Sequence, residues 1–216
     1  MKYKAILFDL DGTLLDTLED LAASVNSGLA DLGFPQHRIS DYKYFVGWGR
    51  EEMAARALPE GKRDPALIDR LCEIINREYM QHWSDHTRPY DGIPEMLDTL
   101  TSRRVTMTVL SNKPHDFTEL MVTRLLSRWH FEIVAGASPD MPKKPDCTVA
   151  LNICRQLKTE PRKFLFLGDS EIDMQTAVNA GMYPVGALWG FRTAAELKAG
   201  GAKKLIKDPR ELLEFF

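Results

Sequence analysis

Long apolar runs, basic clusters and abundant cysteine are all missing from this 216-residue sequence. No apolar run approaches the roughly 18 residues that a membrane-spanning helix needs, and the run after Lys4 stops at Asp9, too early for the core of a signal peptide. A formal net charge of -3, without any Lys/Arg-rich block, offers no field that would attract nucleic acid. The three cysteines, Cys72, Cys147 and Cys154, lack metal-ligand spacing and indicate reduced thiols in a cytoplasmic protein.

The first fourteen residues contain the most informative local pattern. Ala5 to Phe8 form an apolar run of the right length for a buried strand, and Asp9, Asp11 and Gly12 follow directly. Two carboxylates this close repel each other, and burying them unpaired costs still more. A cation would remove that cost. The stretch therefore predicts a divalent-metal site at the carboxyl end of a first strand.

The block from 15 to 83 carries helical patterns. Apolar residues recur at helical spacing from about 16 to 32, and the stretch from about 39 to 83 is also helical in pattern, with interruptions at 46–49 and 59–65. No strand-like run is evident between Thr13 and Arg88. We therefore expect residues 15–83 to form a small inserted helical cap that selects the substrate.

Strands and helices alternate after Pro89. Strands are expected at about 105–110, 132–135, 163–167, 183–188 and 203–206, and helices at about 93–102, 116–126, 146–157 and 173–181. This alternation predicts an α/β fold with a Rossmann-like parallel sheet and right-handed crossovers. Residues 1–14 and 84–216 would together form its core.

Polar groups follow several of these strands. They are Asp9 and Asp11, Ser111 and Asn112, and Asp169 and Asp173, with Lys144 at a helix start. The carboxyl ends of parallel strands lie on one edge of the sheet, so these groups should converge. Carboxylates suit a hard cation such as Mg²⁺, and hydroxyl, lysine and backbone N–H groups suit a phosphate. The combination supports metal-assisted phosphoryl transfer to a carboxylate.

Four short motifs in this order resemble those of the haloacid dehalogenase superfamily. They are Asp9-Leu10-Asp11-Gly12-Thr13, Ser111-Asn112, Lys144-Pro145, and Gly168-Asp169-Ser170 with Asp173 three residues further on. The resemblance implies that Asp9 attacks phosphorus and becomes an aspartyl phosphate. It implies that Asp11 protonates the leaving oxygen and then activates water. Family members that cleave carbon–halogen bonds lack this second aspartate, so Asp11 favours a phosphatase.

The same resemblance assigns the binding groups. Ser111 and Lys144 would hold the phosphoryl oxygens, and Mg²⁺ would be bound by Asp9, the backbone carbonyl of Asp11, and Asp169. Asp173 would act on a metal-bound water or on Lys144, although an acid near a helix start also simply favours the helix dipole. Gly12, Thr13 and Asn112 are also assigned to phosphate or substrate binding.

The cap loop suggests the substrate. The stretch from Phe45 to Arg50 looks like the glycine-containing cap loop of phosphoglycolate phosphatases, and the pattern from Leu14 to Thr17 fits that group. Arg50 would pair with a substrate carboxylate, although a plain surface arginine fits the sequence equally well. We therefore expect a small phosphorylated metabolite, with phosphoglycolate as the leading substrate.

Three other functions fit parts of the pattern. The nearest is a capped phosphatase of another small ester, such as a nucleotide, a sugar phosphate or pyrophosphate. The second is a β-phosphoglucomutase-type isomerase on the same scaffold. The third is a non-catalytic binding protein, which the five intact residues Asp9, Asp11, Ser111, Lys144 and Asp169 argue against. The sequence predicts no oligomeric state.

Overall fold

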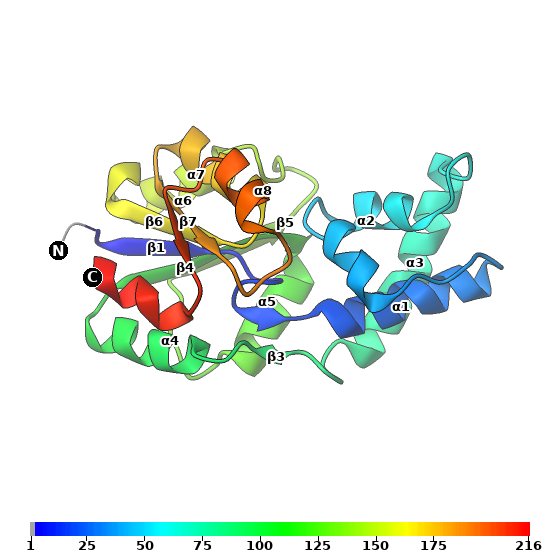
Figure 1. Cartoon of the computed structure of the whole chain (residues 1–216), viewed down its shortest axis with the longest axis horizontal. Helices are drawn as coiled ribbons and strands as arrows, with labels where there is room; N and C mark the ends of the chain where they lie inside the picture. The colour runs from blue at the N-terminus through cyan, green and yellow to red at the C-terminus, as the bar shows by residue number, and fades with distance from the viewer. Residues whose placement is uncertain (1–2) are drawn as a thin grey trace.

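A six-stranded parallel sheet, with the strand order β5-β4-β1-β6-β7-β8, organises the computed structural model, which describes residues 3–216 (Figure 1). The strands are β1 Ala5–Phe8, β4 Thr106–Pro114, β5 Ile133–Ala137, β6 Phe164–Gly168, β7 Tyr183–Ala187 and β8 Lys204–Ile206. All neighbouring pairs in this sheet are parallel. The predicted α/β fold with a parallel sheet is confirmed.

The first strand is central because both of its faces are covered by helices. Ile6 and Phe8 join a hydrophobic cluster that contains residues of helices α4 and α5, whereas Ala5 and Leu7 join a cluster that contains residues of α6 and α7. The helices around the sheet are α4 Ile93–Ser102, α5 His115–Leu125, α6 Thr148–Gln156, α7 Glu171–Ala180 and α8 Ala194–Ala199. Successive side chains on a strand point to opposite faces, so a strand covered on both faces has an unbroken apolar sequence.

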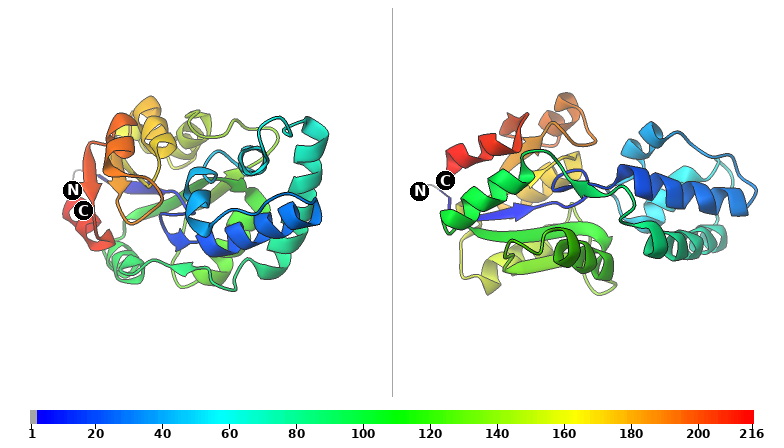
Figure 2. Two further views of the ribbon diagram at one scale, coloured as in Figure 1. Left: turned by 45° about the vertical axis from the view of Figure 1, so that its right-hand side comes forward. Right: turned by 90° about the horizontal axis from the view of Figure 1, so that it is seen from below.

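Helices α1 Leu18–Asp31, α2 Arg50–Ala57 and α3 Pro65–His82 lie together beyond one end of the strands, with the 3-10 helix η1 Ile39–Tyr44 beside them (Figure 2). They share a hydrophobic cluster of their own, in which α1 contributes Val25 and Leu29 and α3 contributes Leu71 and Ile75. This packing explains why the apolar residues of the block recur with helical spacing. Both chain termini lie at the opposite end of the molecule (Figure 1).

Two very short strands connect this helical group to the sheet. β2 Leu15–Asp16 pairs antiparallel with β3 Arg88–Pro89. The expectation of no strand between Thr13 and Arg88 was wrong here, because a strand of two residues is too short to show a period. Because β2 occupies residues 15 and 16, the first helix begins at Leu18 and not at about residue 16 as predicted.

A buried carboxylate makes a second connection between the helical group and the chain that follows it. The side chain of Asp20, on α1, is 2% exposed and accepts hydrogen bonds from the backbone N–H groups of His86 and Thr87 and from the Thr87 hydroxyl. Burial alone would raise the pKa of Asp20, but these hydrogen bonds lower it. Helix α1 is therefore held against the chain that returns from the helical group.

Strand β4 is longer than expected. It was predicted to end at residue 110, yet it continues to Pro114, with a shift of register between Leu110 and Pro114. The irregular pairing explains why the polar residues here looked like the end of a strand. Helix α8 and the terminal 3-10 helix η3 Pro209–Phe215 were not predicted. Among residues 3–216, no helix is both long enough and apolar enough to cross a membrane.

Candidate active site

Three buried carboxylates meet at the carboxyl edge of the sheet. Asp9 follows β1 and Asp169 follows β6, and these strands are paired so that Phe8 lies opposite Leu167. Asp173 lies in the first turn of α7. One oxygen from each carboxylate lies within 4.8 Å of the other two. The sheet therefore brings together two of the predicted metal ligands and the predicted supporting acid.

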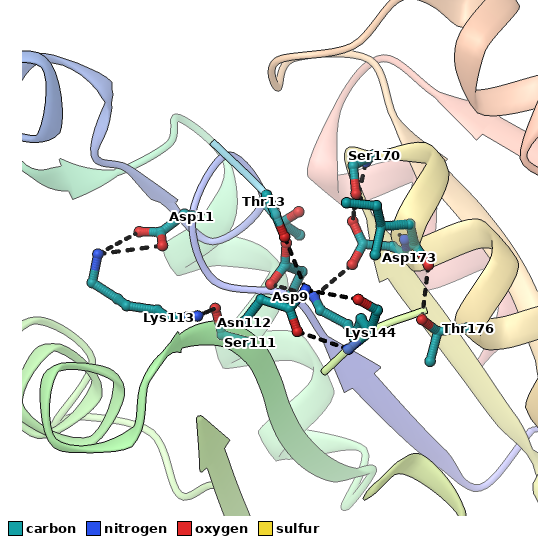
Figure 3. A network of polar contacts seen from close by, with 12 residues as sticks. Asp9, Asp11, Thr13, Ser111, Asn112, Lys113, Lys144, Ser170, Asp173 and Thr176 are labelled. Atoms are coloured by element: carbon teal, nitrogen blue, oxygen red, sulfur yellow. Dashed lines mark hydrogen bonds and ion pairs between the residues drawn. The ribbon is translucent and has the colours of Figure 1, made fainter. Parts of the chain in front are cut away.

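A buried lysine partly balances this negative charge. Lys144 Nζ lies 2.8 Å from Asp9 Oδ1 and 2.6 Å from Asp173 Oδ1 (Figure 3). Burial, together with repulsion from Asp173, raises the pKa of Asp9 well above its usual range despite this lysine. Burial and Asp173 also raise the pKa of Asp169, to about 7. The three carboxylates thus remain short of positive charge.

The donor set fits a divalent cation. Asp9 Oδ1 is buried, and among residues 3–216 its close partner is the Lys144 ammonium, 2.8 Å away in an ion pair. Carboxylate oxygens in a crowded acidic site suit a hard cation, which would restore the missing charge. A divalent metal is therefore accommodated by Asp9 and Asp169, with Asp173 nearby.

Two glycines leave room for Asp169. A Cβ atom at Gly190 would lie 2.2 Å from Asp169 Cβ, and one at Gly12 would lie 2.4 Å from Asp169 Oδ2. Gly12 also has φ of +84°, which favours glycine. The backbone N–H of Phe191 donates to Asp169 Oδ2 at 2.7 Å. The position of Asp169 therefore depends on a loop, containing Gly190 and Phe191, to which the sequence analysis assigned no function.

Asp11 lies apart from the acidic cluster and faces a lysine that belongs to none of the four sequence motifs. Lys113 Nζ lies 3.2 Å and 3.3 Å from the two Asp11 carboxylate oxygens (Figure 3). Ser111 and Lys113 are two residues apart on β4. A predicted strand continuing past Ser111 would have placed both side chains on one face, because side chains alternate along a strand. Because the strand was predicted to end at residue 110, the shared face of Ser111 and Lys113 was missed.

Three residues predicted to bind phosphate or substrate have their polar groups occupied within the protein. The Gly12 N–H donates to Leu15 O at 2.9 Å, and the Thr13 hydroxyl donates to Asp169 Oδ1 at 3.1 Å. Asn112 accepts from Lys144 N and donates to the carbonyl oxygens of Lys144 and Gly47, all between 2.8 and 2.9 Å. These contacts hold Gly12, Thr13 and Asn112 in place within the site, and their contact with phosphate or substrate stays a prediction.

The segment 43–51, which includes the predicted cap loop, is held against the sheet edge by residues that follow the helical group in the chain. Besides Asn112, the buried Arg192 donates to the carbonyl oxygens of Lys43 and Val46. Lys143 Nζ lies 2.6 Å from Glu51, at the start of α2. Burial would raise the pKa of Glu51, but Lys143 lowers it to about 2. No local sequence signal indicates Arg192, because its partners, the carbonyl oxygens of Lys43 and Val46 and the Glu171 carboxylate at 3.3 Å, lie far along the chain.

The pocket between the sheet edge and the helical group is lined by Asp9 and Asp169 of the acidic cluster and by Arg50. It encloses about 720 Å³ of empty space, its open mouth included. Arg50 donates to Asn76 at 2.9 Å and to Glu51 at 3.1 Å, and its buried Nε has no partner in the described part of the chain. The other residues that line the pocket include Asp11, Val46, Met53, Ile75, Tyr79, Ser111, Lys113, Phe117, Lys144 and Phe191. The pocket thus offers a polar floor, apolar walls and two arginines, Arg50 and Arg192.

Comparisons with known proteins agree with this site. Residues 6–187 match the family described as haloacid dehalogenase-like hydrolase. A phosphoglycolate phosphatase of Pseudomonas putida is 31% identical over 213 residues, 97% of this chain and 78% of that protein. An N-acetylmuramic acid 6-phosphate phosphatase of Pseudomonas aeruginosa is 32% identical over 218 residues, 99% of this chain and 95% of that protein.

A solved structure extends the similarity to the whole fold. A protein of Lactobacillus delbrueckii subsp. bulgaricus, provisionally named a phosphoglycolate phosphatase, superposes with a TM-score of 0.93 at 29% identity, covering 99% of this chain and 98% of that one. The chain therefore belongs to the haloacid dehalogenase-like hydrolase family. Its relatives place it among the phosphatases of that family. The resemblance seen in the four sequence motifs is confirmed.

Proposed function

We propose that this protein is a cytoplasmic, Mg²⁺-dependent phosphatase that hydrolyses a small phosphorylated metabolite through an aspartyl phosphate on Asp9, with phosphoglycolate as the leading substrate. The observation that carries this proposal is the buried Asp9 carboxylate at the pocket floor, 2.8 Å from Lys144 and beside Asp169. Residues 1–14 and 84–216 would form the catalytic core, and residues 15–83 the cap that selects the substrate.

The side chains support a two-step reaction. Asp9 attacks phosphorus, so a bond from its oxygen to phosphorus forms while the bond to the leaving oxygen breaks, and Asp11 gives that oxygen a proton. Water then attacks the phosphorus of the aspartyl phosphate, Asp11 takes its proton, and the Asp9 carboxylate leaves. Lys144 and Ser111 hold the phosphoryl oxygens throughout.

Charge compensation makes this attack feasible. An anionic carboxylate must approach an anionic phosphate, and Lys144 reduces their repulsion. Bound Mg²⁺, held by Asp9, Asp169 and the backbone carbonyl of Asp11, would supply further positive charge. Asp173 keeps Lys144 in place through its 2.6 Å contact.

The choice of phosphoglycolate rests on Arg50 and on the relatives. The unpartnered Nε of Arg50 supports a contact with a substrate carboxylate. The relatives from Pseudomonas putida and Pseudomonas aeruginosa are named for phosphoglycolate and for N-acetylmuramic acid 6-phosphate, and both compounds carry a carboxylate as well as a phosphate. A phosphorylated sugar acid is therefore the second candidate substrate.

A panel of phosphate esters tests these assignments. We expect purified protein to release phosphate from phosphoglycolate with a higher kcat/KM than from sugar phosphates without a carboxylate. Equal or faster turnover of a sugar phosphate without a carboxylate would exclude phosphoglycolate as the leading substrate. Conversion of glucose 1-phosphate to glucose 6-phosphate, without phosphate release, would instead identify the isomerase.

The covalent step has its own test. Asp9→Asn keeps the size of the side chain and removes the attacking charge, so this variant should fold and release no phosphate from p-nitrophenyl phosphate. Near-normal hydrolysis by Asp9→Asn would exclude the covalent mechanism. If the wild-type protein hydrolysed none of these esters, the alternative of a non-catalytic binding protein would be favoured.

A further inference from the structure

Lys113 is a buried cation whose hydrogen-bonding capacity is fully used. An ammonium group carries three N–H donors. Lys113 Nζ contacts the two Asp11 carboxylate oxygens at 3.2 and 3.3 Å and the Tyr79 hydroxyl at 3.0 Å. Burial alone would lower the pKa of Lys113, but Asp11 and Tyr79 raise it to about 12. This lysine therefore remains charged and attached to Asp11.

The backbone of Lys113 is also fixed. Its N–H donates to Ser111 Oγ at 3.2 Å, and its carbonyl accepts from the Thr118 hydroxyl at 3.2 Å. The Asp11–Lys113 pair lies to one side of the Asp9, Lys144 and Asp173 group (Figure 3). Lys144, rather than Lys113, is thus the lysine placed to hold the phosphoryl group.

Tyr79 brings the cap into this arrangement. It lies on α3, where its ring packs 5.1 Å from the ring of Phe117 and the Lys113 ammonium lies 4.5 Å from its ring centre. Burial raises the pKa of Tyr79 to about 12, so its hydroxyl stays neutral and accepts the hydrogen bond from Lys113. The Lys113 ammonium is therefore held from the core by Asp11 and from the cap by Tyr79.

We propose that Lys113 is a positioning residue for Asp11, and that Tyr79 makes this positioning depend on the cap. If helix α3 moves away from the sheet edge, Tyr79 leaves with it and the Lys113 side chain loses its third contact. Asp11 is then held by a lysine free to change rotamer. Proton transfer is thereby favoured when the pocket is covered. This inference rests on the proposed phosphatase function.

The leaving group distinguishes positioning of Asp11 from general damage. An alkyl ester such as phosphoglycolate needs a proton on its leaving oxygen, whereas p-nitrophenolate leaves without one. In single-turnover reactions, Lys113→Met should slow cleavage of the alkyl ester by ~10²-fold and that of p-nitrophenyl phosphate by less than ~10-fold. Tyr79→Phe, which removes only the hydroxyl, should show the same selectivity with a loss of ~3–10-fold on the alkyl ester.

Two further variants make the experiment decisive. If Lys113 acts through Asp11, the double variant Lys113→Met with Asp11→Asn should be no slower than Asp11→Asn alone. Lys62→Met, an exposed lysine of the helical group, removes the same charge elsewhere and should leave both rates unchanged. If the wild type cleaves an ester other than phosphoglycolate, that alkyl ester replaces it.

Each other outcome has a definite meaning. Equal losses on the two esters, a double variant that is markedly slower than Asp11→Asn, or a raised KM with unchanged kcat would each overturn the positioning role. Unchanged rates in Tyr79→Phe would overturn the dependence on the cap. A wild-type protein that hydrolyses neither ester would instead contradict the proposed function.

Discussion

Asp169 should make the metal-free protein less stable as the pH rises from about 5 to about 8. Its pKa is raised to about 7 in the folded protein, whereas an aspartate in an unfolded chain titrates near ~3.9. The folded chain therefore holds this proton more tightly than the unfolded chain. Below a pH of about 4, Asp169 does not lower the free energy of unfolding. The full loss of stability is reached once the pH has risen through about 7.

The magnitude follows from the two pKa values. The difference between them corresponds to at most about 4 kcal/mol. Asp9, which also has a raised pKa, shares the same burial and the same neighbour Asp173, so we assign about 2 kcal/mol to Asp169. For a chain of this size, that free energy shifts Tm by about 4–8 °C. Bound Mg²⁺ would remove the same repulsion, so it should raise Tm more at about pH 8 than at about pH 5.

Thermal unfolding of chelator-treated protein, followed by fluorescence between about pH 5 and about pH 8 with and without Mg²⁺, measures both effects. Glu51, with a pKa of about 2, stays charged over this range. Asp169→Asn retains hydrogen-bonding groups that can pair with the Phe191 N–H and with the Thr13 hydroxyl, but it carries no charge. It should flatten the profile, abolish the Mg²⁺ effect and exceed the wild type in Tm at high pH without metal. A wild-type Tm that is constant or falls toward pH 5, or an Asp169→Asn profile as steep as that of the wild type, would refute this reasoning.

Three further substitutions test supporting contacts. Gly190→Ala should reduce phosphatase activity at least ~10-fold and Tm by the equivalent of ~1–3 kcal/mol through overpacking, whereas Gly61→Ala, which has open space, should lower Tm slightly and leave activity intact. Asp20→Asn should lower the unfolding free energy in urea by ~2 kcal/mol, because buried N–H donors lose a charged acceptor. Glu51→Gln breaks the contact with Lys143 and should raise KM, measured by phosphate release, while the salt dependence of KM weakens.

The sequence predicted those parts of the site that follow directly from strand ends. Asp9 and Asp169 each come after an apolar strand, and parallel pairing brings such positions to one edge of the sheet. Lys144 was predicted from the motif resemblance, and it lies against Asp9. The helical block was predictable because its residues pack around a core of their own and so keep a helical period.

The missing parts depend on contacts between distant segments. Lys113 meets Asp11 and Tyr79 only after the sheet and the helical group have folded together. Arg192 bonds to backbone carbonyls, which leave no signature in the side chains of their own segment. Asn112 was assigned to phosphate or substrate binding through the motif resemblance, and its internal partners, Lys144 and the backbone of Gly47, could not be read from the sequence. Local pattern identifies which polar residues reach the pocket edge, and tertiary packing decides which of them remain free.

The pairing of β2 with β3 has a consequence for how this fold can vary. The chain enters the helical group after Asp16 and leaves it before Arg88, and these two residues are direct partners in the two-stranded ladder. Any insert whose ends meet at that ladder leaves the order of the six large strands untouched. The junction is thus a site at which one inserted segment could be exchanged for another without disturbing the large sheet. A chimaera joined at these two residues would keep Asp9, Lys144 and Asp169 in register while presenting them with a different pocket wall.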